Sequence, residues 1–287
     1  MSARAQRTLL LAPFAIGTLV LVVGPAAITF LESLYEDDLI APARFVGFDN
    51  FSALAQDDLF AQVLRNSALF LAITVPLRVL GALALALLLH RPRRGAGWQR
   101  GAVLAGSFAP DAALVIAFAY LLNPISGPVN GLLGLAGLPQ PEWFAAPGAA
   151  LAGIVLISAF SLGEGFLVML AARQQLPGEL FEAARMEGAS TGHVFRRLTL
   201  PLLAPVLGLL AARDLAVALQ ASFVPTYLLT DGGPDRATLL LPIHIYDVGF
   251  EQLRYGYAAA MTVVMVVLTA LIVLAQWRLM RRWRIDP

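Results

Sequence analysis

The chain has 287 residues, of which 59% are hydrophobic and only 14% are charged, and its formal net charge is +1. Soluble domains carry about 25% charged residues, so this composition excludes an ordinary soluble protein and predicts an integral membrane protein. The absence of cysteine excludes disulfide scaffolds, thiol catalysis and cysteine-based metal sites.

Long apolar stretches recur along the chain, each able to cross a bilayer, which takes about 20 residues. They predict an all-α membrane protein with a single transmembrane domain, residues 1–287. The first stretch follows the basic start MSARAQR, but it is longer than the roughly 7–15 apolar residues of a signal peptide, so we expect an uncleaved anchor. The six expected spans are about 9–31, 66–89, 101–122, 148–172, 201–224 and 258–276.

Several spans contain residues that interrupt a regular helix. Pro76 and Pro110 fall inside the second and third spans, and Gly163 and Gly165 flank Glu164 in the fourth. Such breaks are tolerated where the freed backbone lines a cavity or finds another partner. They also occur as plain kinks, and the sequence leaves both interpretations open.

Five charged residues fall near the middle of the expected spans: Arg78, Asp111, Glu164, Arg213 and Asp214. A charge there costs at least about 2.5–3.5 kcal/mol, so they predict a polar interior. In one interpretation Arg78 pairs with Asp111 or Glu164 and fixes the bundle. Arg213 and Asp214 lie about 100° apart on a helix, so we expect them to face different neighbours.

In the other interpretation these charges belong to a substrate pocket. Carboxylates and amides bind sugar hydroxyl groups, and aromatic rings cover the apolar faces of a sugar, although aromatic residues in a span also serve simple packing. The candidate residues of the substrate pathway are Asp111, Asn123, Glu164, Asp214, Gln220, Phe160 and Phe223.

Arginine placement predicts the orientation. The segments before the first span, after the second, after the fourth and after the sixth hold fourteen arginines, whereas the segments on the other side hold four. Cytoplasmic loops are enriched in basic residues, so we expect both termini in the cytoplasm.

The segment 173–200 between the fourth and fifth spans contains EAARMEGAST at 182–191. Pro177 can open a short helix, Gly188 can end it in a left-handed conformation, and Ser190 can cap a second helix. We therefore expect two short helices joined by a bend. They form either an ordinary connector or an element that docks onto another protein.

The stretch EAARMEGASTGHVFRRLTLPLLAP, 182–205, resembles the EAA signature of ABC-importer permeases, E-A-A-x-x-[DE]-G-A followed by a proline. In that family the loop is a coupling helix, which sits in a groove of a cytoplasmic ATPase subunit. The resemblance implies the coupling residues Glu182, Ala183, Ala184, Glu187, Gly188 and Ala189.

Three further stretches resemble carbohydrate-type permeases: FVGFDNFSAL at 45–54, GPVNGLLGLAGLPQPEWF at 127–144, and YLLTDGGPDRATLLLPIHIYDVGFEQLRYGYAAAM at 227–261. Together they resemble the first permease of the pair in maltose- and glycerol-3-phosphate-type importers. The chain departs from that pattern at Phe160, in a region where the family often has tryptophan.

The resemblance implies a permease subunit of an ATP-driven, binding-protein-dependent importer, which catalyses no reaction of its own. The chain has no lysine and no GxxxxGK[ST] loop, so it cannot hydrolyse ATP; no catalytic constellation or metal motif is found, and we expect no cofactor in this chain. The implied partners are a homologous second permease, a cytoplasmic ATPase dimer that binds ATP and Mg, a solute-binding protein outside the cell, and the bacterial or archaeal plasma membrane. No nucleic-acid partner is expected.

The implied substrate is a sugar or oligosaccharide. The alternatives are another polar solute, such as a polyamine or a phosphate ester, moved by the same machinery, and a proton-coupled secondary transporter with Asp111 and Glu164 as proton carriers. Secondary transporters usually contain internal repeats, and no convincing duplication is present in this sequence.

Overall fold

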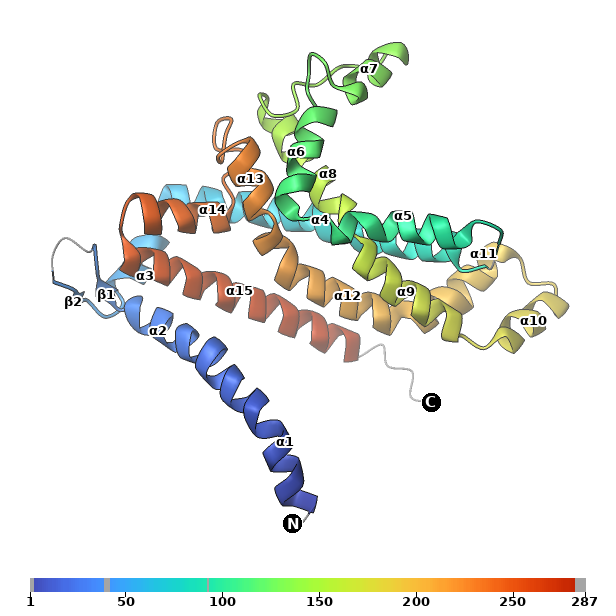
Figure 1. Cartoon of the computed structure of the whole chain (residues 1–287), viewed down its shortest axis with the longest axis horizontal. Helices are drawn as coiled ribbons and strands as arrows, with labels where there is room; N and C mark the ends of the chain where they lie inside the picture. Colours follow the sequence, from blue (N-terminus) through green and yellow to red (C-terminus); the bar gives the residue numbers. More distant parts are fainter. Residues whose placement is uncertain (1–2, 39–41, 92, 282–287) are drawn as a thin grey trace. The chain divides into compact units, whose positions relative to one another are not determined.

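In the computed structural model of the chain, residues 3–38, 42–91 and 93–281 are described, and they are mostly helical (Figure 1). The chain folds into two compact units, Met1–Gln62 with His244–Leu268 and Val63–Ile243 with Thr269–Pro287. The predicted all-α class is confirmed. The only departure among the described residues is a short pair of strands, each two residues long.

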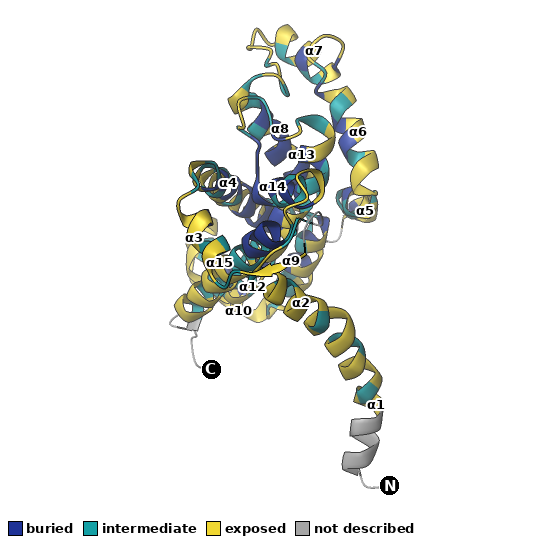
Figure 2. Cartoon of the chain, turned by 90° about the vertical axis from the view of Figure 1, so that its left-hand side faces the viewer, coloured by how far each residue is buried: buried dark blue, intermediate teal, exposed yellow. Residues whose placement is uncertain are grey.

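The first unit contains the N-terminal helices and parts of the two longest helices. Its elements are α1 (Ala3–Thr18), a π-helical turn (Leu19–Val23), α2 (Gly24–Glu32), β1 (Tyr35–Glu36), β2 (Arg44–Phe45), α3 (Asp49–Ala55), the start of α4 (Asp58–Leu89), the second half of α14 (Leu241–Tyr246), a second π-helical turn (Asp247–Glu251) and the first half of α15 (Tyr255–Arg281). The apolar side chains of Leu10–Glu32 are mostly exposed (Figure 2), as a helix that contacts lipid requires.

Hydrogen bonds fix the backbone conformation around the stretch 45–54. The strands pair antiparallel, with Tyr35 opposite Phe45. The Asn50 side-chain amide donates to the Ser33 and Tyr35 carbonyls, both at 2.9 Å, and Gly47 has a φ of +60°, which favours glycine. The asparagine and glycine of this motif therefore hold the backbone of the segment between α2 and α3.

The second unit contains the remaining helices. They are the rest of α4, α5 (Ala96–Phe108), α6 (Asp111–Leu121), α7 (Pro128–Leu135), α8 (Pro147–Phe160), α9 (Gly163–Gln175), α10 (Gly178–Met186), α11 (Thr191–Val194), a π-helical turn (Phe195–Thr199), α12 (Leu200–Ala221) and α13 (Phe223–Leu229), with the start of α14 and the end of α15.

Four helical segments among the described residues are long and apolar enough to cross a membrane: Leu10–Glu32, Asp58–Leu89, Thr191–Leu229 and Tyr255–Met280. Two bent pairs, α5 with α6 and α8 with α9, pass the same test, and they bring the number to six if each pair is one span. The expected third and fourth spans are thus broken helices, while Pro76 lies inside the uninterrupted α4.

The two breaks have different local causes. At the first, Pro110 forces the preceding Ala109 into an extended conformation, and α6 leaves α5 at 105°. At the second, the bend is 47° and α9 begins at Gly163. A Cβ at Gly163 would lie 2.6 Å from Ser107 Oγ, so only glycine allows α9 to approach α5 this closely.

A core of apolar side chains holds α4, α9 and α12 together. Its buried members are Val75, Val79, Ala82, Leu83, Ala86, Phe166, Met169, Leu170, Leu203, Leu210 and Ala218. A second, smaller cluster packs α6 against α8 through Val115, Phe118, Leu122 and Ile157. The polar site described below is lined by residues from all five of these helices.

Candidate functional site

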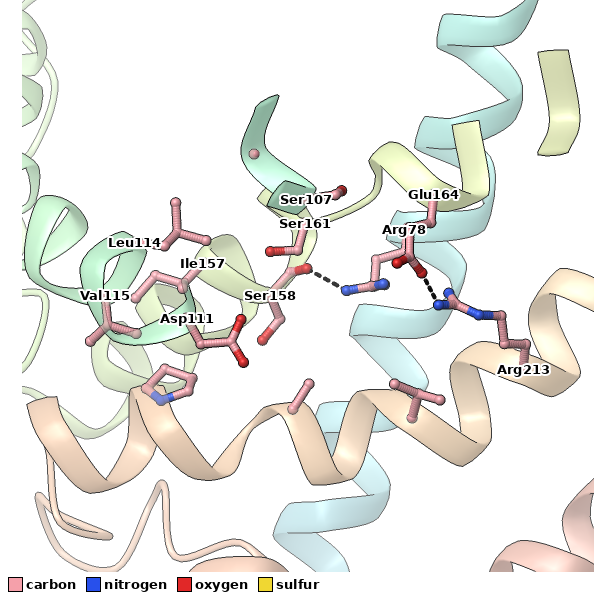
Figure 3. Close-up of a pocket in the computed structure, with 14 residues that line it drawn as sticks. Arg78, Ser107, Asp111, Leu114, Val115, Ile157, Ser158, Ser161, Glu164 and Arg213 are labelled. Atoms are coloured by element: carbon pink, nitrogen blue, oxygen red, sulfur yellow. Dashed lines mark hydrogen bonds and ion pairs between the residues drawn. The ribbon is translucent and has the colours of Figure 1, made fainter. Parts of the chain in front are cut away.

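A polar pocket of about 220 Å³ lies where the two broken helices meet α4 and α12 (Figure 3). Its apolar wall includes Leu114, Val115 and Ile157. The polar side chains that line it come from α4, α5, α6, α8, α9 and α12: Arg78, Ser107, Asp111, Ser158, Ser161, Glu164 and Arg213.

The innermost charge of the pocket is paired. Arg78 Nε lies 3.2 Å from Asp214 Oδ2, Arg78 Nη1 donates to the Ser158 carbonyl at 2.8 Å, and both charged side chains are over 90% buried. The expectation that Arg78 pairs with Asp111 or Glu164 is therefore wrong. Arg78 belongs to the stripe of α4 that faces the core. Asp214 lies on the matching stripe of α12, four residues after Leu210 and four before Ala218.

The second arginine links this pair to the pocket rim. Arg213 forms an ion pair with Glu164 on α9, and its Nη1 lies 3.3 Å from Asp214 Oδ1. Arg213 and Asp214 do reach different neighbours, as expected, and they also contact each other. The side chains of Arg213 and Glu164 are 38% and 62% exposed, so this outer pair is hydrated and weaker than the inner one.

Asp111 is the pocket's available carboxylate. It is the first residue of α6, directly after the break that separates this helix from α5. It is exposed, and no hydrogen bond or ion pair joins it to another described residue. With three carboxylates and two guanidinium groups, the site carries one excess negative charge.

The serines of the pocket are functional candidates that the sequence interpretation missed. Ser107 Oγ accepts a hydrogen bond from the Gly163 N–H at 2.9 Å. Ser158 Oγ is buried and has no hydrogen-bond partner among the described residues, so it is available to a ligand. Ser158, Ser161 and Glu164 recur every three residues, and this spacing in an apolar span was the available signal.

The seven candidate pathway residues divide into two groups. Asp111 and Glu164 line the pocket, and Asp214 lies behind Arg78. The other four do not line it. Asn123 Oδ1 accepts from the backbone N–H groups of Ile125 and Ser126 and so caps a turn.

Gln220 is exposed on α12. Phe223 stacks on Tyr227 with ring centroids 5.5 Å apart. Phe160 packs edge-on against Phe118 and lines a separate apolar cavity.

The segment 173–200 contains the expected pair of short helices. α10 ends at Met186, Gly188 follows with a φ of +75°, and the Ala189 N–H donates to the Ala184 carbonyl at 3.0 Å. Ser190 caps α11 by accepting from the His193 N–H. The segment differs from expectation at its ends, because α9 continues to Gln175 and a π-helical turn runs directly into α12.

One face of α10 is fixed to α9 and the other is open. Phe181 is buried beneath the Arg173 guanidinium, 4.4 Å from its ring centre. Glu182 and Ala183 are exposed, and Met186 is 89% exposed. An exposed methionine next to small side chains suits close contact with another protein.

These features define a class: a polytopic helical membrane transport protein with a polar pocket between broken helices. The chain belongs to the family of binding-protein-dependent transport system inner membrane components, which matches residues 78–285. It is therefore a permease subunit of an importer, and ATP hydrolysis belongs to a separate subunit.

Relatives whose transport systems are named match nearly the whole chain. The sulfoquinovosyl glycerol transport system permease protein SmoG of Agrobacterium fabrum is 32% identical over 97% of this chain and 91% of its own. The sn-glycerol-3-phosphate transport system permease protein UgpA of Salmonella typhimurium is 31% identical over 94% and 92%. The fold matches a bacterial ABC transporter involved in the import of the acidic polysaccharide alginate, with a TM-score of 0.80 at 24% identity over 98% of both chains.

Proposed function

We propose that this permease carries a neutral sugar or oligosaccharide, together with a homologous second permease, a cytoplasmic ATPase dimer and an extracytoplasmic solute-binding protein. The observation that carries the proposal is the pocket itself, in which an available carboxylate and a buried serine hydroxyl face a space enclosed by two broken helices. Such groups accept and donate hydrogen bonds to the hydroxyl groups of a polyol.

The charges of the pocket favour a neutral substrate over a phosphate ester. Both guanidinium groups are already paired with carboxylates, so no free cation remains to bind a phosphate, and the excess charge is negative. The substrates named for two relatives, sulfoquinovosyl glycerol and glycerol-3-phosphate, support a substrate with polyol hydroxyl groups. Both are anions, so the choice of a neutral substrate rests on the charges of the pocket alone. A cationic solute such as a polyamine is the second candidate, favoured by the unpaired Asp111.

The second part of the proposal is that α10 transmits the action of the ATPase. Its exposed face, with Glu182, Ala183 and Met186, fits a shallow groove on a partner. Phe181 and Arg173 couple its movement to α9, which carries Glu164 at the pocket. The ATPase supplies the sites for ATP and Mg. Arginine-rich segments on this side support an orientation with both termini in the cytoplasm of a bacterial or archaeal cell.

The test is purification of the tagged chain from its host under mild conditions, identification of its partners by mass spectrometry, and measurement of ATP hydrolysis by the reconstituted complex. We expect a second permease and an ATPase to co-purify, and neutral oligosaccharides with the binding protein to stimulate hydrolysis. Stimulation by polyamines alone would favour the second candidate. Recovery of the chain alone, with uptake driven by a proton gradient, would contradict the proposal.

A matched pair of variants tests the pocket in the same assay. Asp111→Asn removes the available carboxylate and should lower stimulation by the substrate at least several-fold. Glu142→Gln removes an exposed carboxylate outside the pocket and should leave stimulation unchanged. Equal behaviour of the two variants would argue against the pocket as the binding site.

A further inference from the structure

The turn that joins α4 to α5 is basic, and no acidic side chain pairs with its arginines among the described residues. It carries Arg91, Arg93 and Arg94. Arg173, in the last turn of α9, is held against Phe181, and its Nε atom is buried without a hydrogen-bond partner. Among the residues that the structure describes, none of these four arginines forms an ion pair.

A different arginine fixes the turn in place. Arg100 donates from Nε and Nη2 to the Leu89 carbonyl, at 3.0 and 2.6 Å, and so caps the end of α4. Nearby guanidinium groups create a positive electrostatic potential around His90, the residue after Leu89. Burial lowers the pKa of His90, the Leu87 carbonyl partly opposes this, and the guanidinium groups of Arg173, Arg91 and Arg93 lower it further.

An apolar cavity of about 490 Å³ opens along the same two helices. On α4 it is lined by Leu77, Gly81 and Leu85, which recur every four residues and so share one face over roughly 12 Å. Ala102 and Val103 of α5 form a second wall, and Leu156, Ala159 and Phe160 of α8 with Leu162 form the third. Leu77 is 46% exposed, so the cavity is open at the side of α4 on which Leu77 lies.

The basic turn and the apolar cavity are two ends of one site. Leu85 precedes Leu89, the last residue of α4, by four residues, a rise of roughly 6 Å along the helix, and Arg91 follows two residues after that end. The cavity therefore extends from just below the turn toward the centre of the span. Trp98, 83% exposed at the start of α5, has the position of an aromatic residue at the membrane interface.

We propose that this site, the α4–α5 lipid site, binds an anionic phospholipid, with its phosphate at Arg91, Arg93 and Arg173 and an acyl chain in the cavity. A free phosphate would use the arginines and leave the cavity unexplained. A helix of a partner permease would fill the cavity and leave the arginines without a counterion. The proposal requires that the chain is inserted in a membrane and is independent of the transported substrate.

The test uses the assembled complex, purified in a neutral detergent and equilibrated with equal amounts of phosphatidylglycerol and phosphatidylcholine of the same acyl composition. Native mass spectrometry then gives the ratio of the two lipids retained. The wild type should prefer phosphatidylglycerol. A basic residue near an anionic lipid surface contributes about fivefold, so the double variant R91Q/R93Q should lower that preference by about 25-fold. R65Q, which removes an exposed arginine near the opposite end of α4, should change it less than twofold.

A second pair of variants tests the cavity without touching the charges. Ala102→Phe places a ring in the cavity and should reduce retention of phosphatidylglycerol, and Ala105→Phe, exposed on the same helix outside the cavity, should not. Three results would overturn the proposal: equal retention of both lipids by the wild type, displacement of phosphatidylglycerol by millimolar inorganic phosphate, or retention by the isolated chain that is lost in the assembled complex.

Discussion

At the scale of single residues, the pocket combines two ion pairs that differ in burial. Arg78 and Asp214 are both over 90% buried, whereas Arg213 and Glu164 are 38% and 62% exposed. The sequence predicts that charges at these positions need a polar interior, because lipid cannot solvate them. It does not predict their partners, because these depend on how α4 and α12 align and on a bend that carries Asp111 away from Arg78.

The difference in burial predicts a difference in stability. Asp214→Ala leaves a buried guanidinium without a counterion and should destabilise the protein by about 3–5 kcal/mol. Glu164→Ala removes an exposed partner and should cost less than about 1 kcal/mol. Thermal unfolding midpoints of the purified variants measure both. Similar midpoints would show that Arg78 finds another partner.

The carboxylate of Asp57, one residue before the span Asp58–Leu89, predicts a dependence of stability on pH. Burial raises the pKa of Asp57, but hydrogen bonds from Tyr257 and from the N–H groups of Phe60 and Leu59 outweigh this, and the pKa is lowered below the ordinary 3.8. A lowered pKa means that ionised Asp57 stabilises the fold above pH 3.8 and that this contribution disappears as the pH falls through the folded-state pKa.

Tyr257→Phe removes the 2.9 Å bond to Asp57 Oδ2. We expect it to lower the unfolding free energy by about 1 kcal/mol at pH 6–7, with a gap to the wild type that narrows as the pH approaches 3. Unfolding midpoints of both proteins across this range provide the measurement. A gap that is constant with pH would mean that the bond does not depend on the charge of Asp57.

At the scale of elements, proline and glycine residues predicted where a helix could be interrupted, but they did not predict the bend angle. Pro110 and Pro76 look alike in the sequence, yet α5 and α6 meet at 105° while α4 runs on through Pro76. The outcome depends on packing around each proline, which no local pattern reports. The loops were more predictable, because Gly188 and Ser190 act through local backbone geometry, which is encoded in the residues themselves.

The polar residues of two other loop motifs also act locally. Asn130, 2% exposed, donates to the Pro124 and Pro141 carbonyls and accepts from Trp143 Nε1. Thr238 is buried, bonds the Thr230 hydroxyl and donates to the Gly233 carbonyl at 2.7 Å. In this chain these motif residues hold the loops in shape, and contact with substrate is not needed to explain them.

The bend after α10 gives a prediction for coupling. Gly188 has a left-handed backbone, whereas Gly192 has neither a positive φ nor an atom near its missing Cβ. Gly188→Ala should therefore cost about 1–2 kcal/mol and lower substrate-stimulated ATP hydrolysis, and Gly188→Pro, whose φ is fixed near −65°, should abolish it. Gly192→Ala is the matched control. Full coupling in a well-expressed Gly188→Pro variant would count against this role of the bend.

At the scale of the whole molecule, composition alone predicted a helical membrane protein, and short motifs predicted the family to which the chain belongs. The pocket was only partly predictable. Its carboxylates stood out as charges in apolar spans, but its serines did not, and Phe160 and Phe223 were placed there by residue type although they pack elsewhere. A pocket lined by seven helices depends on three-dimensional packing that spacing along one helix cannot supply.

The central claim is that an ATPase acts on this permease through α10, and the absence of native cysteines makes it directly testable. A single cysteine in place of Ala183, labelled with a photoreactive maleimide in native membranes, should form a cross-link to an ATP-hydrolysing subunit identified by mass spectrometry. Ala136→Cys, exposed beyond the end of α7, should form none. Absence of an ATPase adduct from position 183, or equal adducts from both positions, would contradict the account.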